Sequence, residues 1–147
     1  MTEYPEKLAE LLDDLSFITT RNDRIEYLID LADRFDAVRV PEDIATKPYS
    51  EANHVQRCES DAYVWAIDQA DGTQKYYFDV LNPQGLSAMA MGVILDETLS
   101  GQPPEEVAKV SSEIVFKIFG KEVSMGKGQG LMGMVNRVVA IAKSKLK

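Results

Sequence analysis

Two alternating segments on either side of a tight-turn signal constrain the fold of this chain most. A large apolar side chain occupies every second position in both segments, at Tyr63, Trp65 and Ile67 and then at Tyr76, Phe78 and Val80. A period of two is typical of a β-strand. Asp71-Gly72, between the segments, is a strong hairpin signal. The sequence therefore predicts an antiparallel hairpin, and we expect residues 54–56 to add a short third strand before it.

Apolar residues at helical spacing occur in the sequence both before and after this hairpin. Leu8, Leu11, Leu12 and Leu15 lie on one face of a first helix, and a second is predicted from about Asp23 to Arg34 with Asn22 as its cap. Residues 36–53 have no clear period and are predicted to form a long ordered loop. Further helices are predicted after Asn82-Pro83 as far as Gly101, at 102–110, at 111–120 and from about 130 to 142.

Helices, a hairpin and then more helices predict an α+β fold: a small antiparallel sheet of about three strands, covered by helices. A chain of 147 residues is expected to form a single domain, residues 1–147. A chain of this size buries about 68–70% of the surface that its unfolded form exposes, which is enough for a self-sufficient core.

The cysteine count, the net charge and the lack of long apolar runs exclude several classes of protein. The single cysteine, Cys58, excludes an internal disulfide and a zinc or iron–sulfur site built from several cysteines of this chain. A net charge of −8 argues against nucleic acid or an anionic membrane as the main partner. The acidic N-terminus does not resemble a signal peptide, and no apolar run approaches the roughly 18 residues of a membrane span. We therefore expect a cytoplasmic protein.

The charge is unevenly distributed. Residues 1–36 carry ten acidic and four basic side chains, whereas residues 117–147 carry seven basic and one acidic. The simplest explanation is a basic C-terminal helix that is favoured by its own dipole.

The glycine-rich stretch "GKGQGLMG" matches G-x-G-x-x-G at Gly128, Gly130 and Gly133. A dinucleotide-binding fingerprint also needs a preceding strand and an acid about 20 residues later, and neither is present. A phosphate loop fails as well, because Gly128 stands where Ser or Thr is required. The stretch is predicted to be a flexible loop that leads into the last helix.

Cys58 is the candidate reactive group. It lies in the polar run "HVQRCESDAYVW", although a cysteine kept for packing normally has apolar neighbours. The adjacent cation of Arg57 favours the thiolate, which is the nucleophilic form. One alternative is a small hydrolase or acyltransferase that uses Cys58 with His54 as its base, although an extended segment would place these residues about 13 Å apart. Another is an interaction domain with an inert cysteine.

Four elements in order resemble the SufE-like family of sulfur-acceptor proteins. "RIEYLIDLADRF" resembles its second helix, and "VQRCESDAYVW" resembles its V-x-G-C-x-S-x-V-W core with one or two residues extra. "GQPPEEV" and "VSMGKGQGLMGMVNRV" resemble its G-x-x-P-E-E-I element and its closing segment. Arg57 replaces the usual glycine, Lys127 the usual arginine and Gln129 the usual asparagine.

The resemblance implies a SufE/IscU-like fold and a role in iron–sulfur cluster assembly. It implies that Cys58 accepts sulfane sulfur as a persulfide from a pyridoxal-phosphate-dependent cysteine desulfurase of the SufS type, which the protein activates. The sulfur would pass to a SufBCD-like scaffold. The protein itself would be a carrier and not an enzyme, without a cofactor or metal of its own, and a monomer or weak homodimer. Arg57, Lys127, Gln129 and His54 are the candidate residues for tuning the thiolate or binding a partner.

Overall fold

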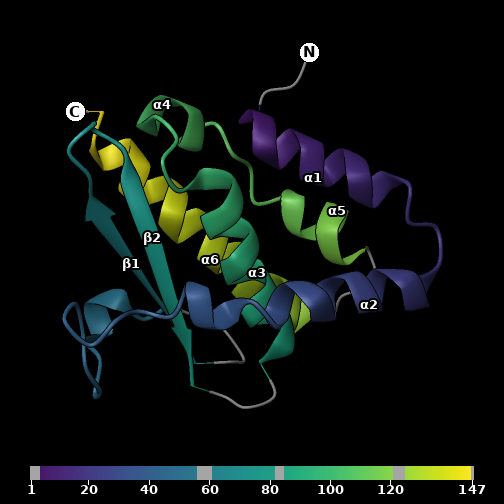
Figure 1. Ribbon diagram of the computed structural model, residues 1–147, viewed down its shortest axis with the longest axis horizontal. Coiled ribbons are helices and arrows are strands. Elements are labelled where there is room, and N and C mark those ends of the chain that lie inside the picture. Colours follow the sequence, from purple (N-terminus) through teal and green to yellow (C-terminus); the bar gives the residue numbers. More distant parts are fainter. Residues whose placement is uncertain (1–3, 56–60, 82–84, 121–124, 147) are drawn as a thin grey trace.

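The protein is described from a computed structural model that covers residues 4–55, 61–81, 85–120 and 125–146, without the side chains of residues 125–127. The α-helices are α1 (Glu6–Ser16), α2 (Arg21–Ala32), α3 (Leu86–Leu99), α4 (Pro104–Val107), α5 (Ile114–Phe119) and α6 (Met125–Ser144). The strands are β1 (Ala62–Asp68) and β2 (Gln74–Val80), and two 3-10 turns are η1 (Phe35–Ala37) and η2 (Glu51–Asn53). Figure 1 shows the strands on one side of the molecule and α1 on the other.

The sheet is the predicted antiparallel hairpin. The register runs from Ala62 opposite Val80 to Asp68 opposite Gln74. Gly72 has φ +87° in the turn, a conformation that glycine adopts without the steric cost of a Cβ atom. The α+β prediction is confirmed, whereas the third strand at residues 54–56 is wrong for the described part of the chain. His54 forms only an isolated bridge to Tyr63, because the 3-10 turn η2 occupies the residues directly before it.

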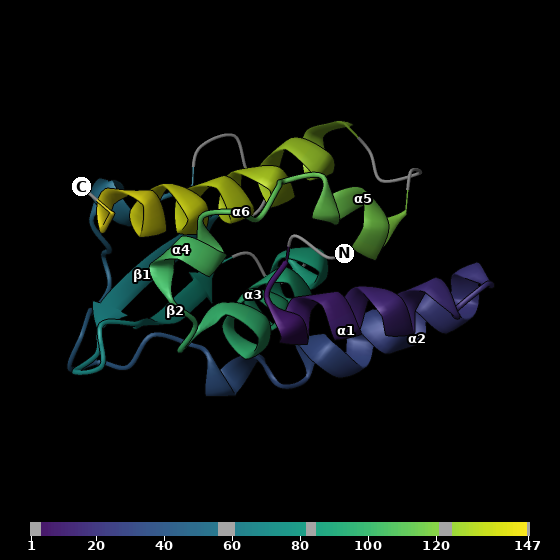
Figure 2. The ribbon, with the colours of Figure 1, turned by 90° about the horizontal axis from the view of Figure 1, so that it is seen from above.

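One face of the sheet packs on helices α3 and α6, as Figure 2 shows from above. Ala62 and Val64 of β1 and Phe78 of β2 are completely buried in this core. α3 is buried along most of its length. The same hydrophobic cluster contains side chains from Leu8 of α1 to Ala142 of α6, so all six α-helices contribute to one core. Burial of this kind is the main source of folding free energy.

Gly92 of α3 allows a close approach within this core. A Cβ atom at Gly92 would lie 3.2 Å from Cγ of Phe78 and 3.3 Å from Cε1 of Phe35. Both aromatic rings are almost completely buried. Glycine thus lets the helix backbone pack directly against the two rings.

The opposite face of the sheet is covered by the loop that precedes it. Tyr63 and Trp65 of β1 and Val40 of the loop form a second buried cluster, against which Tyr49 packs. The predicted loop at 36–53 is confirmed as irregular chain apart from its 3-10 turns and one bridge, which joins Arg39 to Phe78.

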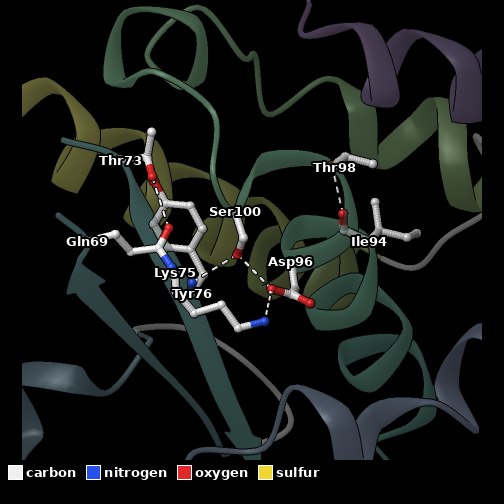
Figure 3. Close-up of polar contacts among 8 residues, drawn as sticks. All are labelled: Gln69, Thr73, Lys75, Tyr76, Ile94, Asp96, Thr98 and Ser100. Atoms are coloured by element: carbon white, nitrogen blue, oxygen red, sulfur yellow. Dashed lines mark hydrogen bonds and ion pairs between the residues drawn. The ribbon is translucent and has the colours of Figure 1, made fainter. Parts of the chain in front are cut away.

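Polar contacts also join β2 to α3 (Figure 3). Asp96 of α3 accepts a hydrogen bond from the Lys75 ammonium at 2.5 Å and another from the Ser100 hydroxyl at 2.6 Å. The Ser100 oxygen in turn accepts a 3.0 Å hydrogen bond from the backbone N–H of Tyr76. The network fixes the end of α3 against the middle of the hairpin.

Arg24 of α2 holds the ends of two other helices together. Its guanidinium donates hydrogen bonds to the carbonyl oxygens of Lys117 and Ile118 in α5, at 3.1 and 2.9 Å. It also reaches the carbonyls of Leu15 and Ile18 at the end of α1, at 3.5 and 3.4 Å. The last carbonyls of a helix have no partner within the helix, and Arg24 supplies one.

Two predicted helix starts differ from the structure. Thr20, and not Asn22, caps α2, because its side-chain oxygen accepts the N–H of Asp23 at 3.1 Å. α6 begins at Met125, so the whole glycine-rich stretch, residues 126–133, is helical and does not form the predicted loop. Gly128 and Gly130 are buried there, and tertiary packing outweighs the low helix propensity of glycine. In the described ranges, no helix has the length and apolar character needed to cross a membrane.

Candidate functional site

The segment that carries the predicted thiol has two anchored flanks. Cys58 and Arg57 themselves lie outside the described residues. On one flank, the N–H of Val55 donates a 2.8 Å hydrogen bond to the carbonyl of Ala62. On the other, the carbonyl of Asp61 accepts a 2.9 Å hydrogen bond from the N–H of Leu81. The chain therefore leaves the sheet and rejoins it at neighbouring points.

His54 connects these two flanks. Its Nδ1 lies 3.5 Å from a carboxylate oxygen of Glu51, and its Nε2 lies 3.5 Å from a carboxylate oxygen of Asp61. The imidazole also packs on the ring of Tyr63, with 4.9 Å between the ring centroids. Both ring nitrogens thus face carboxylates, one just before His54 and one on the far flank of the cysteine segment. His54 therefore lies between the two flanks.

The aromatic ring on which His54 packs belongs to a cluster of three rings. The ring of Tyr49 meets those of Tyr63 and Trp65 edge to face, at centroid distances of 5.1 and 4.8 Å. Such pairs contribute about 0.5–1.5 kcal/mol each beyond the area they bury. The cluster holds the loop of residues 36–53, and with it His54, against the start of β1.

The Tyr49 hydroxyl is fixed by a buried acid. It donates a 2.6 Å hydrogen bond to Asp79, which also accepts the N–H of Val80 at 2.8 Å and lies 3.5 Å from the guanidinium of Arg39. Burial, followed by this hydrogen bond, raises the pKa of Tyr49 to about 12. No pattern in the sequence indicates this pair of residues. Tyr49 lies in a loop without a period, and the alternation in β2 predicts that Asp79 faces outward.

Gln129 and Lys127 belong to the first turns of α6. The Gln129 side chain is exposed, and the side chain of Lys127 lies outside the described set. α6 packs along β1, and Lys145 near its end forms a 2.9 Å ion pair with Asp68 at the end of the strand. Figure 1 shows the two elements running in the same general direction, so α6 begins toward the end of the molecule where β1 begins. The structure therefore brings the backbone of 127–129 toward the flanks of the cysteine segment without showing a contact.

Two hollows in the described part of the chain lie away from these residues. A pocket of about 580 Å³ lies at the hairpin turn, between Asp71 and Pro104, and a larger groove of about 1230 Å³ runs along α1. Of the predicted site residues, the two with described side chains, His54 and Gln129, line neither of them. No group of three or more His, Cys, Asp or Glu side chains within the described ranges is placed to hold a metal ion.

Comparisons with known proteins agree with the motifs in the sequence. The family model for the SufE "Fe-S metabolism associated domain" matches residues 9–142. An uncharacterized SufE-like protein of Rhizobium meliloti is 26% identical over 148 residues, with 95% of this chain and 96% of that protein covered. Another uncharacterized SufE-like protein, from Rhizobium etli, is 26% identical over 140 residues, with 92% and 89% covered.

A solved structure supports the fold alone. The solution structure of a hypothetical protein from Thermus thermophilus superimposes with a TM-score of 0.69 at 24% identity. The match covers 97% of this chain and 98% of that one. The arrangement of a small sheet and several helices is thus shared along nearly the whole length of both proteins.

Proposed function

This chain belongs to the SufE family of Fe–S metabolism associated proteins, and from that premise we propose that it accepts sulfur from a cysteine desulfurase. The acceptor is Cys58, which carries the sulfur as a persulfide and delivers it to an iron–sulfur scaffold. In this proposal the protein is a cytoplasmic carrier that activates its desulfurase and performs no reaction by itself. The whole chain, residues 1–147, acts as one sulfur-acceptor domain.

The observation that carries this proposal is that the single cysteine of the chain falls within the family match. Cys58 lies between residues 9 and 142, in the motif "VQRCESDAYVW". The hydrogen bonds of Val55 and Asp61 support it, because they hold both flanks of its segment at one end of a rigid hairpin. Reactive residues are commonly carried by connections whose ends are positioned by a rigid scaffold.

The proposed step conserves atoms and electrons. The Cys58 thiolate attacks the terminal sulfur of a persulfide on the desulfurase, and a new sulfur–sulfur bond forms as the donor's bond breaks. The donor cysteine leaves as a thiolate, and the transferred sulfur carries its proton with it. No external oxidant or reductant is needed, because the oxidised sulfur is exchanged between two thiols. Pyridoxal phosphate belongs to the donor enzyme, where it supplies the chemistry that releases sulfur from cysteine.

The thiolate fraction limits the rate of this step. An ordinary cysteine with a pKa of about 8.5 is only about 3% ionised at pH 7. In the proposal, Arg57 and Lys127 supply positive charge that raises this fraction, and Gln129 contributes to partner binding. A modest effect serves best, because a thiolate of very low pKa is also a weaker nucleophile.

The contacts of His54 favour this proposal over a thiol enzyme. A hydrolase or acyltransferase would need the imidazole as a base for Cys58. His54 instead faces Glu51 and Asp61 with its two nitrogens and packs on Tyr63. Its proposed role is to hold the flanks of the cysteine segment.

The decisive experiment is intact mass spectrometry after incubation with a cysteine desulfurase and free cysteine. The expected result is one added sulfur atom, which is lost on reduction and absent in Cys58→Ser. His54→Ala is expected to retain sulfur acceptance, whereas an enzyme that used His54 as its base would lose all activity. Wild-type protein that gains no sulfur from any tested desulfurase, with Cys58 freely alkylated by iodoacetamide, would overturn the proposal.

A further inference from the structure

A second surface feature of this protein is a groove along α1. The groove of about 1230 Å³ runs along α1 and is bounded on its other side by α4 and α5. Figures 1 and 2 both show α1 on the side of the molecule away from the sheet. The groove therefore lies along a helix on the side of the fold away from the sheet.

One wall of the groove is acidic, and its charges are not neutralised. Glu6, Glu10 and Asp13 follow one another at helical spacing along α1 and line the groove. All three are exposed, and none forms an ion pair with a residue of the described ranges. Like charges at this spacing repel one another, so a cation placed against the wall lowers the electrostatic free energy.

The cations already in the groove are engaged in other contacts. Arg24 donates to backbone carbonyls of α1 and α5, as described above. The Lys117 ammonium lies 5.4 Å from the centre of the Tyr4 ring, in a cation–π contact. Glu106 on the opposite wall pairs with Lys109 at 2.9 Å. Of the four acids that line the groove, only Glu106 thus has an ion-pair partner in the described ranges, and the three on α1 have none.

Apolar surface continues the acidic wall at one end. Leu12 is half-buried and lines the groove, and Phe17, one residue beyond Ser16 of the lining, is 77% exposed. Phe17 follows the lining residue Ser16 in the chain, and large exposed aromatic side chains are anchors that binding interfaces use. Carboxylates along the wall and an apolar end together fit a helix that is basic on one side and apolar on another.

We propose that this groove binds a lysine- and arginine-rich amphipathic helix of a partner protein. Because α1 lies away from the sheet to which both flanks of the cysteine segment are bonded, the groove is available to one partner while another approaches the thiol. Binding in the groove does not depend on sulfur transfer, since none of the groove residues takes part in the proposed chemistry. Cys58→Ser is accordingly expected to bind a basic helix as well as the wild-type protein does.

The test uses a fluorescein-labelled 16-residue peptide of lysine and leucine at amphipathic helical spacing, with binding followed by fluorescence anisotropy. Glu6→Gln, Glu10→Gln and Asp13→Asn are combined in one variant. Three charge pairs in a solvent-accessible groove are together expected to contribute about a tenfold change in Kd. The matched control combines Glu26→Gln and Asp30→Asn, both exposed on α2, with Asp33→Asn at its C-cap, which changes the net charge equally.

The groove variant is expected to bind about tenfold more weakly, and the α2 variant within about twofold of wild type. Ala9→Arg, which adds a cation at the centre of the wall, serves as an independent variant and is expected to weaken binding to a similar degree. Amide NMR shifts caused by the peptide should concentrate in α1 and α5. Equal weakening in both triple variants, or full affinity in the groove triple and Ala9→Arg, would overturn the proposal. Self-association of the chain through the groove, with no peptide binding, would also contradict it.

Discussion

The hydroxyl of Tyr49 donates a 2.6 Å hydrogen bond to the carboxylate of Asp79, which is only 3% exposed. The two residues are 30 positions apart and join the covering loop to the second strand. The same tyrosine ring packs on Tyr63, against which His54 lies. The position of the loop and that of the candidate site are therefore linked through one buried acid.

Tyr49→Phe is expected to lower the free energy of unfolding by about 1–3 kcal/mol, because it removes one hydrogen-bond donor from a buried carboxylate. Urea denaturation measures the change. Tyr77→Phe is the matched control, since Tyr77 packs in the same cluster but its hydroxyl makes no hydrogen bond with the described residues. The interpretation fails if the two variants lose equal stability.

Asp96→Asn is expected to cost about 1–3 kcal/mol, because Lys75 and Ser100 both donate to this largely buried carboxylate. The neighbouring Glu97 forms a 3.2 Å pair with Arg34 at the surface. Exposed pairs contribute at most about 1 kcal/mol, so Glu97→Gln should change stability much less. Chemical denaturation at neutral pH compares the two variants, and equal losses would contradict the network's importance.

The stability of the protein is expected to fall as the pH rises above about 10. Burial raises the pKa of Tyr76 to about 12, whereas an unfolded tyrosine titrates near 10. Between these values the unfolded state loses a proton that the folded state keeps, and alkali therefore favours unfolding. The expected slope is about 1.4 kcal/mol per pH unit for this one side chain. Tyr76→Phe should flatten the slope in urea titrations between pH 9 and 11.5; an unchanged slope would rule out this origin.

Gly92→Ala is expected to destabilise the fold. The new methyl group would crowd the buried rings of Phe78 and Phe35 at 3.2 and 3.3 Å. Overpacking of a core typically costs about 1–3 kcal/mol, which exceeds the gain of at most about 1 kcal/mol in helix propensity. Thermal unfolding measures the net effect, and a raised Tm would show that the rings move aside easily.

Arg57→Ala and Lys127→Ala are expected to slow alkylation of Cys58 roughly 2–5-fold at pH 7, because a nearby cation favours the thiolate. Iodoacetamide reports on this residue alone, since the chain contains one cysteine. The pH profile of the alkylation rate should move to higher pH, and the maximal rate at high pH should not change. Lys143→Ala, in the last turn of α6, is the control and should leave the profile unchanged. If neither variant shifts the profile, these cations do not tune the thiol.

The elements of the fold were predictable from periodicity, because each has a strong local pattern. The alternation around Asp71-Gly72 and the leucine spacing of the first helix both correspond to observed elements. The errors arise where tertiary packing decides. The segment at Gly128 and Gly130 is helical because it is buried, and the strand expected at 54–56 is limited to a single bridge by the turn before it.

The candidate site was predictable only in part. Cys58 stands out in the sequence as a lone thiol in polar surroundings, and its role stays a prediction because it lies outside the described residues. The support of His54 by Tyr49 and Asp79 depends on contacts between distant positions that no local pattern marks. The acidic wall along α1 was visible only as an excess of charge, because a groove exists only once α4 and α5 lie opposite it.

The paired hydrogen bonds at Val55 and Leu81 have an evolutionary consequence. They set the strand alignment on both sides of the cysteine segment, so an insertion or deletion between them leaves the hairpin register untouched. Val55, Cys58 and Ser60 keep the spacing of the pattern that this motif resembles, so its one or two extra residues follow Ser60, where the anchored flank and β1 begin. A change in length between Val55 and Asp61 would alter the segment that carries Cys58, and so its fit to a sulfur donor, while the scaffold of the hairpin stays the same.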